Sequence, residues 1–260
     1  MSRAIPTSVT FIVPALNEGQ VAQAVLTDLI SVVSKSFANY EVLLVDDGST
    51  DDTGIIMDRC AASHERVRVI HNERNIGLGA CYQRGLQEAR CNYVMLLCGD
   101  GGLPARSLPA IFEKIGTADI VIPYMTNLRR IKSPLRFVLS RTYSKLLNTL
   151  FGFKLHYYNG LPVHRTDLLR SIRITSSGFG FQGEILVKLL KSGCSYVQVG
   201  VLGAEETRKS FALRPRNLVS VARTLLHLIA EIVRFRPVPK EVVERGRDQA
   251  DLDLNAHPAK

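Results

Sequence analysis

The feature of this sequence that most constrains its fold is an apolar segment that ends in a cluster of acids. Val42–Val45 has the composition of a buried β-strand, and Asp46 and Asp47 follow it directly. The next residues, GSTDD, add a glycine, two hydroxyl groups and a second acidic pair. A buried strand that stops at acids places them at the carboxyl edge of a sheet, where open α/β proteins bind ligands. An ordinary strand–turn–helix unit, capped by Ser49 or Thr50, is the alternative.

Strands and helices alternate along the first 125 residues. Apolar runs predict strands at residues 9–14, 42–47, 67–71, 93–97 and 119–123. Helical spacing predicts helices at residues 20–36, 51–63, from the glycine turn at 75–80 to about residue 90, and near 108–114. A further helix and strand are expected at residues 179–190 and 195–203. This alternation predicts an α/β fold with a mostly parallel sheet covered by helices on both faces.

The composition indicates which kinds of partner and which redox compartment to expect. The net charge of +9 favours an anionic partner, although a merely basic soluble protein has the same balance. The five cysteines form no CxxC pair, so a reducing compartment is expected and a disulfide framework is not. The N-terminus lacks the pattern of a signal peptide, and no charge-free segment is long enough to span a membrane. Nucleic-acid binding is not expected, because no aromatic residues are interleaved with the basic ones.

Polar residues recur wherever a predicted strand ends. Asn17 and Glu18 follow the first strand, Asp46 and Asp47 the second, and Asp100 the fourth. The carboxyl ends of parallel strands share one edge, so these acids should converge there. A divalent cation with a nucleotide diphosphate would relieve their mutual repulsion. Neither a GxGxxG dinucleotide fingerprint nor a P-loop lysine is present.

Four segments in this order resemble a family 2 glycosyltransferase with a GT-A fold. They are VTFIVPALNEG, EVLLVDDGSTDDT, ERNIGLGA and YVMLLCGDGGLP. The resemblance implies that the loops after the first two strands hold the nucleotide of a nucleotide-sugar donor. The nucleotide-binding residues it implies are Pro14, Ala15, Asn17, Glu18, Asp46, Asp47, Ser49, Asn75 and Gly79.

The resemblance also implies a Mg²⁺ or Mn²⁺ ion held by Asp100 on the donor diphosphate. The family motif there is Asp-x-Asp, usually followed by a glutamine two residues on. In this chain Cys98 replaces the first acid and Gly102 replaces the glutamine. A hard cation prefers oxygen ligands, so Cys98 is interpreted as a small buried hydrophobic residue. The metal would therefore depend on Asp100, water and the donor phosphates.

The second half of the chain predicts the acceptor. Residues 127–153 combine basic side chains with leucines at helical spacing, which suits either an interfacial helix on anionic headgroups or a helix packed on the domain. The segment from Arg136 to Ser140 is similar to the acceptor region of polyprenyl-phosphate sugar transferases, the dolichyl-phosphate mannose synthase type. The acceptor-phosphate residues implied are Arg129, Arg130, Arg136 and Ser140, with Arg136 also assigned to catalysis.

Three further positions carry hypotheses. Glu184, on a helix that resembles an acid-bearing helix of the family, would be either a base for a hydroxyl acceptor or part of the pocket wall. Arg208 and Lys209 resemble a loop that closes over the diphosphate, although the family spacing is not matched. His164 is a candidate for the site but is more readily explained as a structural residue.

The sequence therefore predicts an inverting glycosyltransferase that moves a sugar from GDP-mannose or a UDP-sugar to a polyprenyl phosphate. Its expected location is the cytoplasmic face of the inner membrane, with peripheral contact to anionic lipid. Two alternatives are a transferase acting on a hydroxyl acceptor and a non-catalytic nucleotide-sugar-binding or scaffold protein. The expected parts are a GT-A domain at 1–212, divided into 1–125 and 126–212, an apolar helix at 213–238 that could mediate self-association through residues 217–235, and a flexible tail at 239–260.

Overall fold

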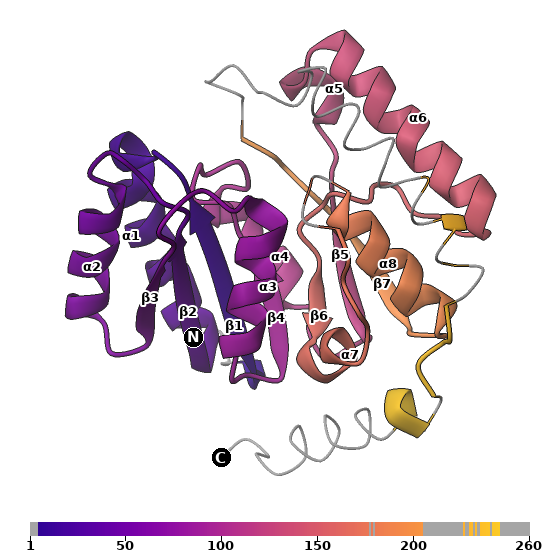
Figure 1. Cartoon of the computed structure of the whole chain (residues 1–260), viewed down its shortest axis with the longest axis horizontal. Coiled ribbons are helices and arrows are strands. Elements are labelled where there is room, and N and C mark those ends of the chain that lie inside the picture. The colour runs from indigo at the N-terminus through magenta and orange to yellow at the C-terminus, as the bar shows by residue number, and fades with distance from the viewer. Residues whose placement is uncertain are drawn as a thin grey trace.

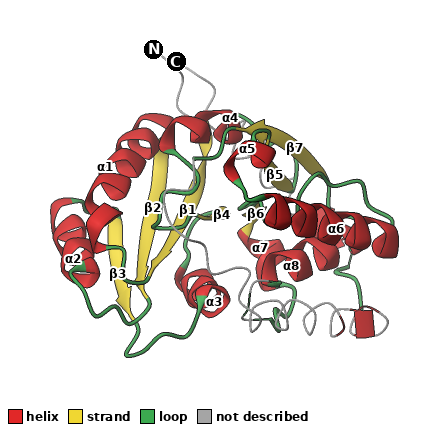
Figure 2. Ribbon diagram, turned by 90° about the horizontal axis from the view of Figure 1, so that it is seen from above, coloured by secondary structure: helices red, strands yellow, loops and turns green. Residues whose placement is uncertain are grey.

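The protein forms one seven-stranded sheet with helices on both faces (Figures 1 and 2). The computed structural model describes residues 5–176, 178, 180–204, 226, 229–230, 232, 235–239 and 241–244. The strands are β1 (Ile5–Ala15), β2 (Phe37–Asp46), β3 (Val67–His71), β4 (Tyr93–Leu96), β5 (Ile120–Met125), β6 (Val163–Arg165) and β7 (Tyr196–Val201). Their order across the sheet is β3-β2-β1-β4-β6-β5-β7.

The sheet is parallel except at one strand. β1, β2, β3 and β4 pair in parallel, as do β5 and β7. The short β6 lies between β4 and β5 and is antiparallel to both. The expectation of a mostly parallel α/β sheet is therefore confirmed, whereas β6 was not predicted. Its three residues are too few to show a strand pattern, and all three are buried.

The helices between the strands are mostly those that the spacing predicted. They are α1 (Gly19–Ser36), α2 (Thr53–Ser63), α3 (Leu78–Glu88), α4 (Leu108–Phe112), α7 (Thr166–Arg170) and α8 (Phe181–Lys191). A short 3-10 turn, Ala105–Ser107, precedes α4. α1, α2 and α4 lie on one face of the sheet, and α3 and α8 lie on the other (Figure 2). The second strand begins at Phe37 rather than Val42, because it also pairs with the start of β1.

Two aromatic groups show how the faces of the sheet are filled. The rings of Phe11, Phe37 and Phe112 pack against one another with centroids 4.8–5.9 Å apart, between the sheet and α4, and the Phe37–Phe112 pair is edge to face. On the opposite face, the rings of Tyr82 on α3 and Phe181 on α8 are 5.5 Å apart. Successive residues of β1 therefore face opposite layers, because Phe11 faces α4 whereas Ile12 packs against Gly85 of α3.

Two helices follow β5 and project beyond its carboxyl end (Figure 1). α5 spans Leu128–Ile131 and α6 spans Pro134–Phe151. α6 packs on the domain through Ser144, Leu147 and Phe151, but other apolar side chains on it remain exposed. The helix is therefore neither fully packed nor simply polar on its outer face. These exposed residues are Leu135, Val138, Leu139, Leu146 and Leu150.

The chain from 205 to 225 lies outside the described residues, and so do Arg208 and Lys209. The predicted helix at 217–235 is described only in part, where Leu226, Ile229, Ala230 and Ile232 are helical. The expected self-association through it, the domain boundaries and the tail remain predictions. In the part of the chain that is described, no helix is long and apolar enough to cross a bilayer.

Candidate functional site

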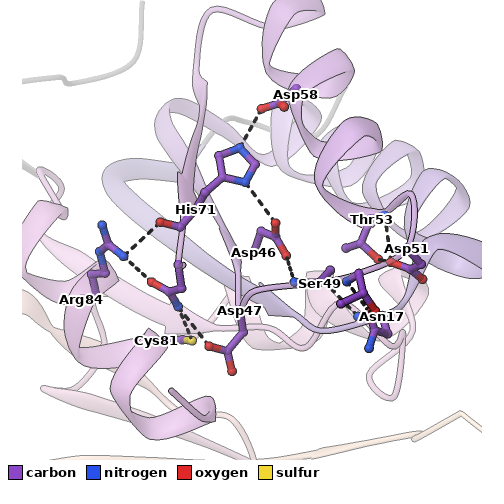
Figure 3. Close-up of polar contacts among 12 residues, drawn as sticks. Asn17, Asp46, Asp47, Ser49, Asp51, Thr53, Asp58, His71, Cys81 and Arg84 are labelled. Atoms are coloured by element: carbon purple, nitrogen blue, oxygen red, sulfur yellow. Dashed lines mark hydrogen bonds and ion pairs between the residues drawn. The ribbon is translucent and has the colours of Figure 1, made fainter. Parts of the chain in front are cut away.

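The loops that follow β1 and β2 are joined by hydrogen bonds into one unit (Figure 3). The Asn17 N–H donates to Ser49 Oγ at 3.1 Å, and the Asn17 side-chain oxygen accepts from the Thr50 N–H at 2.8 Å. The Glu18 N–H donates to Thr53 Oγ1 at 2.8 Å. Asn17 adopts a left-handed φ of 54°, which asparagine tolerates better than most residues. The two predicted nucleotide loops therefore hold each other in place.

The start of α2 differs from the predicted capping arrangement. Neither Ser49 nor Thr50 caps α2, because both pair instead with Asn17 across the two loops. The Asp51 carboxylate accepts from the Thr53 N–H and from the first N–H of α1, each at 3.0 Å. Asp51 thus ties the starts of two helices together. These hydrogen bonds, those with Thr53 foremost, hold the pKa of Asp51 below its ordinary value.

Asp46 is buried at the end of β2 and has two kinds of partner. Its Oδ1 accepts from the Ser49 N–H at 3.0 Å, and its Oδ2 lies 3.0 Å from Nδ1 of His71. Burial by itself would raise the pKa of Asp46, but the hydrogen bonds with Ser49 and His71 outweigh it and leave the pKa lowered. Asp46 is therefore an ionised carboxylate that shapes the loop after β2.

Asp47 orders the glycine turn before α3. Its carboxylate accepts from the N–H groups of Ile76 (2.8 Å) and Gly77 (3.0 Å) and from the Asn72 side-chain amide (3.0 Å). The guanidinium of Arg84 on α3 donates to the Asn72 side-chain oxygen, which leaves the amide N–H₂ directed at Asp47. Of the other residues predicted there, Asn75 is exposed in this turn and Gly79 is buried at the start of α3.

The loop after β4 meets the loop after β1. The Gly99 N–H donates to the Pro14 carbonyl at 3.1 Å, and the Asp47 N–H donates to the Ala15 carbonyl at 2.9 Å. A Cβ on Gly99 would lie only 2.8 Å from the Ala15 Cβ, so the close approach requires glycine. Asp100, next in the chain, is exposed at this edge. The predicted convergence of three strand-exit loops at one edge is confirmed.

Asp100 is the predicted metal ligand. Its Oδ1 accepts from the Gly102 N–H at 2.9 Å. Within the described residues, no group of three or more His, Cys, Asp or Glu side chains could hold a metal ion. Burial, and then the charges of Asp100 and Glu18, raise the pKa of the Cys98 thiol, so Cys98 stays protonated and does not replace the missing acid. A single exposed carboxylate fits Mg²⁺ or Mn²⁺ shared with substrate phosphates, and does not fit a metal held by protein ligands alone.

The loops after β5 and β7 join the same edge. The Asn127 side-chain amide pairs with Gly203 twice: it donates to the carbonyl and accepts from the N–H, both at 2.9 Å. The Ala204 N–H donates to the Gly102 carbonyl at 3.2 Å, which brings the exit of β7 to the loop that carries Asp100. A Cβ on Gly203 would lie 2.7 Å from the sulfur of Met125, so a larger residue there would have to displace the Met125 side chain. Ala204 is the last residue described before the segment that contains Arg208 and Lys209.

The predicted acceptor residues lie on the two helices after β5. Arg129 and Arg130 are exposed on α5, which begins next to Asn127. Arg136 and Ser140 are half-buried in the first two turns of α6, one helical turn apart. The connection between Asn127 and Gly203 therefore places the start of α5 beside the strand exits that carry the acidic residues.

Glu184 is held by structural contacts. Its Oε1 lies 2.6 Å from Lys188 Nζ, and its two oxygens accept from the N–H groups of Thr175 and Ser176, each at 2.8 Å. Burial raises the pKa of Glu184, but the hydrogen bonds, led by that of Lys188, outweigh burial and lower the pKa. Both charged side chains are 1% exposed. This arrangement favours a role in the pocket wall over that of a base.

His164 lies inside the sheet. It sits on β6, is 2% exposed, and neither ring nitrogen has a hydrogen-bond partner among the residues that the structure describes. Burial lowers its pKa to about 3, so it is neutral at physiological pH. The structural interpretation of His164 is thus favoured.

A surface hollow of about 470 Å³ lies away from the strand exits. It is lined by residues that include Tyr40, Arg59 and His64, near the start of β2 and the end of α2, and none of the predicted site residues lines it.

The residues that hold the loops of this edge in place by hydrogen bonds were not identified from the sequence. His71, Asn72, Arg84 and Asn127 each bind a loop of this edge through contacts described above. A usable signal existed for two of them, because His71 and Asn72 directly follow the apolar part of the third strand. Nothing local marks Arg84 or Asn127, whose partners lie 12 and 76 residues away in the chain.

Comparison with known proteins agrees with this geometry. Residues 10–176 match Glycosyl transferase family 2. The undecaprenyl-phosphate mannosyltransferase of Micrococcus luteus is 29% identical over 226 residues, which cover 82% of this chain and 91% of that protein. The polyprenol monophosphomannose synthase of Mycolicibacterium smegmatis is 30% identical over 213 residues, covering 77% of this chain and 79% of that protein.

Solved structures share the fold. Glucosyl-3-phosphoglycerate synthase from Mycobacterium tuberculosis, in complex with Mg²⁺ and UDP, aligns with a TM-score of 0.65 at 20% identity over 86% of this chain and 80% of that chain. Mannosyl-3-phosphoglycerate synthase from Rubrobacter xylanophilus aligns with a TM-score of 0.66 at 18% identity, over 90% and 77%. The length of the family match, together with the shared GT-A architecture, shows that this chain is a glycosyltransferase that belongs to family 2.

Proposed function

We propose that the protein transfers a sugar from a nucleotide-diphosphate sugar, GDP-mannose or a UDP-sugar, to a polyprenyl phosphate, with inversion at the anomeric carbon. The observation that carries the proposal is the meeting of the β1, β2 and β4 exits at one edge, where Asp100 is exposed beside Pro14 and Ala15. A polyprenyl phosphate as the acceptor is supported by two relatives described above, the M. luteus and M. smegmatis enzymes, because both are named as polyprenyl-type transferases.

The donor nucleotide would lie against the joined loops of β1 and β2. Pro14, Ala15, Asn17 and Glu18 would line one side, and the Asp46–Asp47 turn with Ser49 the other. The hydrogen bonds between these loops preorganise them, so that little ordering is needed when the donor binds. Asn75 and Gly79 belong to the turn that Asp47 orders, and would form the floor of the same site.

Asp100 would hold Mg²⁺ or Mn²⁺ at the donor diphosphate. A bound divalent cation supplies charge neutralisation for the leaving nucleoside diphosphate. Arg208 and Lys209 would add positive charge there, and their place in the chain supports this, because Ala204 already contacts the Asp100 loop. The M. tuberculosis synthase, which shares the fold, was solved in complex with UDP and Mg²⁺ or Mn²⁺, and this supports the use of a nucleotide and a divalent metal.

The acceptor phosphate would be gripped by Arg136 and Ser140 on α6, with Arg129 or Arg130 on α5. In the reaction, a phosphate oxygen forms a bond to the anomeric carbon while the bond from that carbon to the nucleotide diphosphate breaks. A phosphate acceptor is already an anion, so the step needs alignment rather than a base. This agrees with the contacts of Glu184, whose oxygens are taken up by Lys188 and by backbone N–H groups.

The exposed side of α6 would lie on the cytoplasmic face of an anionic membrane. Leu135 and Val138 are 59% and 56% exposed, and the basic residues Arg129, Arg130 and Arg141 are exposed nearby in the sequence. Apolar and basic side chains together suit an interfacial helix that meets the headgroups of a lipid acceptor. Peripheral binding there would bring the acceptor phosphate to Arg136.

The test is transfer of labelled sugar into lipid. We expect the protein, with Mn²⁺ or Mg²⁺ and undecaprenyl phosphate, to move label from one of a panel of GDP- and UDP-sugars into the organic phase. The Asp100→Asn variant should lose the transfer while keeping the melting temperature, because Asp100 is exposed. Label that enters only a soluble glycan would refute the lipid-phosphate acceptor, and absence of transfer from every donor would refute the proposal as a whole.

A further inference from the structure

His71, the last residue of β3, bridges two carboxylates from different elements. Its Nδ1 lies 3.0 Å from Asp46 Oδ2 at the end of β2, and its Nε2 lies 3.0 Å from Asp58 Oδ1 on α2 (Figure 3). Asp46 is buried, whereas His71 and Asp58 are partly open to solvent. A Cβ on Gly54 would approach Asp46 Oδ2 to 2.9 Å, so glycine is what allows α2 to begin against this pair.

The chemistry of the two contacts specifies the protonation state of the ring. A neutral imidazole has one N–H donor and one acceptor nitrogen, while an ionised carboxylate can only accept. Hydrogen bonds from both nitrogens of His71 to Asp46 and Asp58 therefore require the imidazolium. Asp46 is ionised in this setting, since its pKa is lowered. A neutral ring could keep only one of the two bonds.

The bridge continues into the loops assigned to the donor nucleotide. The other oxygen of Asp46 accepts from the Ser49 N–H, and the Ser49 hydroxyl oxygen accepts from the Asn17 N–H. A continuous path of hydrogen bonds therefore runs from Asp58 on the surface of α2, through His71 and Asp46, to the loop after β1. Displacing the Asp46 carboxylate would shift the turn that carries Ser49.

We propose that His71 is a positioning residue for the donor nucleotide: as an imidazolium it fixes Asp46, and loss of its proton weakens donor binding. The inference rests on the proposed function, because it needs a nucleotide at the edge formed by Asn17, Asp46 and Ser49. Among the described residues of that edge, Asp46 is the hydrogen-bond partner of the His71 ring.

The carboxylates around His71 favour the protonated ring. The hydrogen bonds with Asp46 and then Asp58 raise the pKa of His71, and this exceeds the opposing effect of partial burial. Arg84 on α3 lies on the backbone side of His71, and its guanidinium donates to the His71 carbonyl at 3.2 Å. The ring therefore keeps its proton to a higher pH than an ordinary histidine does, and loses it as the pH rises above the raised pKa.

The test compares nucleotide binding across pH in wild type and two variants. Calorimetry with GDP and UDP, from about pH 6 to about pH 9, would follow the dissociation constant. His71→Gln keeps the size of the side chain but cannot carry charge. Asp58→Asn leaves every predicted donor residue in place and removes one of the two carboxylates. His64→Gln is the matched control, since His64 is exposed at the end of α2 and its ring is hydrogen-bonded to the Cys60 carbonyl of that helix.

We expect the wild-type dissociation constant to rise about fivefold as His71 deprotonates, relative to the His71→Gln curve. This comparison cancels titration of the nucleotide itself. Asp58→Asn should move the midpoint to lower pH, and His64→Gln should match wild type. NMR of the His71 ring protons should show the same midpoint in the free protein.

Each result is decisive. Nucleotide binding with the same pH profile in wild type and His71→Gln would overturn this inference alone, and so would a His71 ring that titrates at its ordinary pKa. Absence of nucleotide binding by wild type at every pH would overturn the proposed function, and the inference with it. If His71→Gln does not fold, Asp58→Asn carries the test, because Asp58 is exposed and its loss leaves Asp46 in place.

Discussion

The buried pair of Glu184 and Lys188 offers a test that separates a structural carboxylate from a catalytic one. The change is Glu184→Gln. It removes a negative charge that is 1% exposed and leaves the equally buried Lys188 ammonium without its carboxylate partner. It also replaces one accepting oxygen by an amide N–H₂ that faces the N–H donors of Thr175 or Ser176. Both effects act on the folded state.

The expected magnitude follows from the burial. Breaking a fully buried ion pair by removing one partner costs about 3–5 kcal/mol of the free energy of unfolding. For a chain of this length, that corresponds to a melting temperature lower by about 6–20 °C. The double variant Glu184→Gln/Lys188→Met should recover most of the loss, because no unpaired charge is then left in the interior. Both proteins should retain transferase activity at a temperature where they are folded.

The assay pairs thermal and urea denaturation with kcat measured well below the melting temperature. A Glu184→Gln variant as stable as wild type, with kcat lower by about a hundredfold or more, would refute the structural assignment. That outcome would make Glu184 a base and would favour a hydroxyl acceptor. Retained kcat with lowered stability would support the pocket-wall role and a phosphate acceptor.

Three further predictions follow from single features. Burial lowers the pKa of His164 from 6.5 to about 3, so the ring is neutral in the folded protein, and its contribution to stability is present above pH 6.5 and is lost as the pH falls toward 3. In urea titrations, protonation of His164 should therefore lower the free energy of unfolding of the wild type by about 2 kcal/mol between neutral pH and about pH 5. The His164→Leu variant should lack this loss. Gly48 has a φ of +73°, and a Cβ there would lie 2.6 Å from the backbone of residue 74, whereas Gly116 has a φ of +91° with open space around it. In urea denaturation, Gly116→Ala should cost about 1–2 kcal/mol of the free energy of unfolding, and Gly48→Ala should cost more. Equal costs would contradict the close approach. Replacing Val138 and Leu139 by serine should weaken sedimentation with anionic vesicles and leave nucleotide binding unchanged, because both side chains are exposed on α6; unchanged sedimentation would contradict membrane contact through this face.

Much of the fold was accessible from the sequence because it depends on short-range patterns. Apolar runs of four to six residues followed by polar loops mark the parallel strands, and their spacing leaves room for one helix each. The ends of β1, β2 and β4 were therefore predicted together with the residues that follow them. β6 was not, since three residues between two neighbours carry no periodic signal.

The sequence likewise predicted where the residues of the candidate site lie, but not which contacts they make. Asn17, Asp46, Asp47 and Asp100 follow strands and could be placed at one edge from the chain order alone. How they are used was not predictable. Capping of the next helix by Ser49 or Thr50 was the alternative interpretation, and Ser49 instead accepts a hydrogen bond from the neighbouring loop. A serine hydroxyl can bond either to the N–H groups at the start of the next helix or to a neighbouring loop. The position of that loop in the folded protein decides which of the two bonds forms.

The sequence by itself determined which residues stand at the strand ends and, through the ordered motifs, that the chain is a family 2 glycosyltransferase. The tertiary structure alone decided which groups support those residues. The ring of His71 lies between Asp46 and Asp58, 25 and 13 residues away, and Asn127 meets Gly203 across 76 residues. The reason is physical: strand and helix formation depends on neighbours along the chain, whereas these polar contacts exist only after the order of strands in the sheet has brought distant loops within hydrogen-bonding distance.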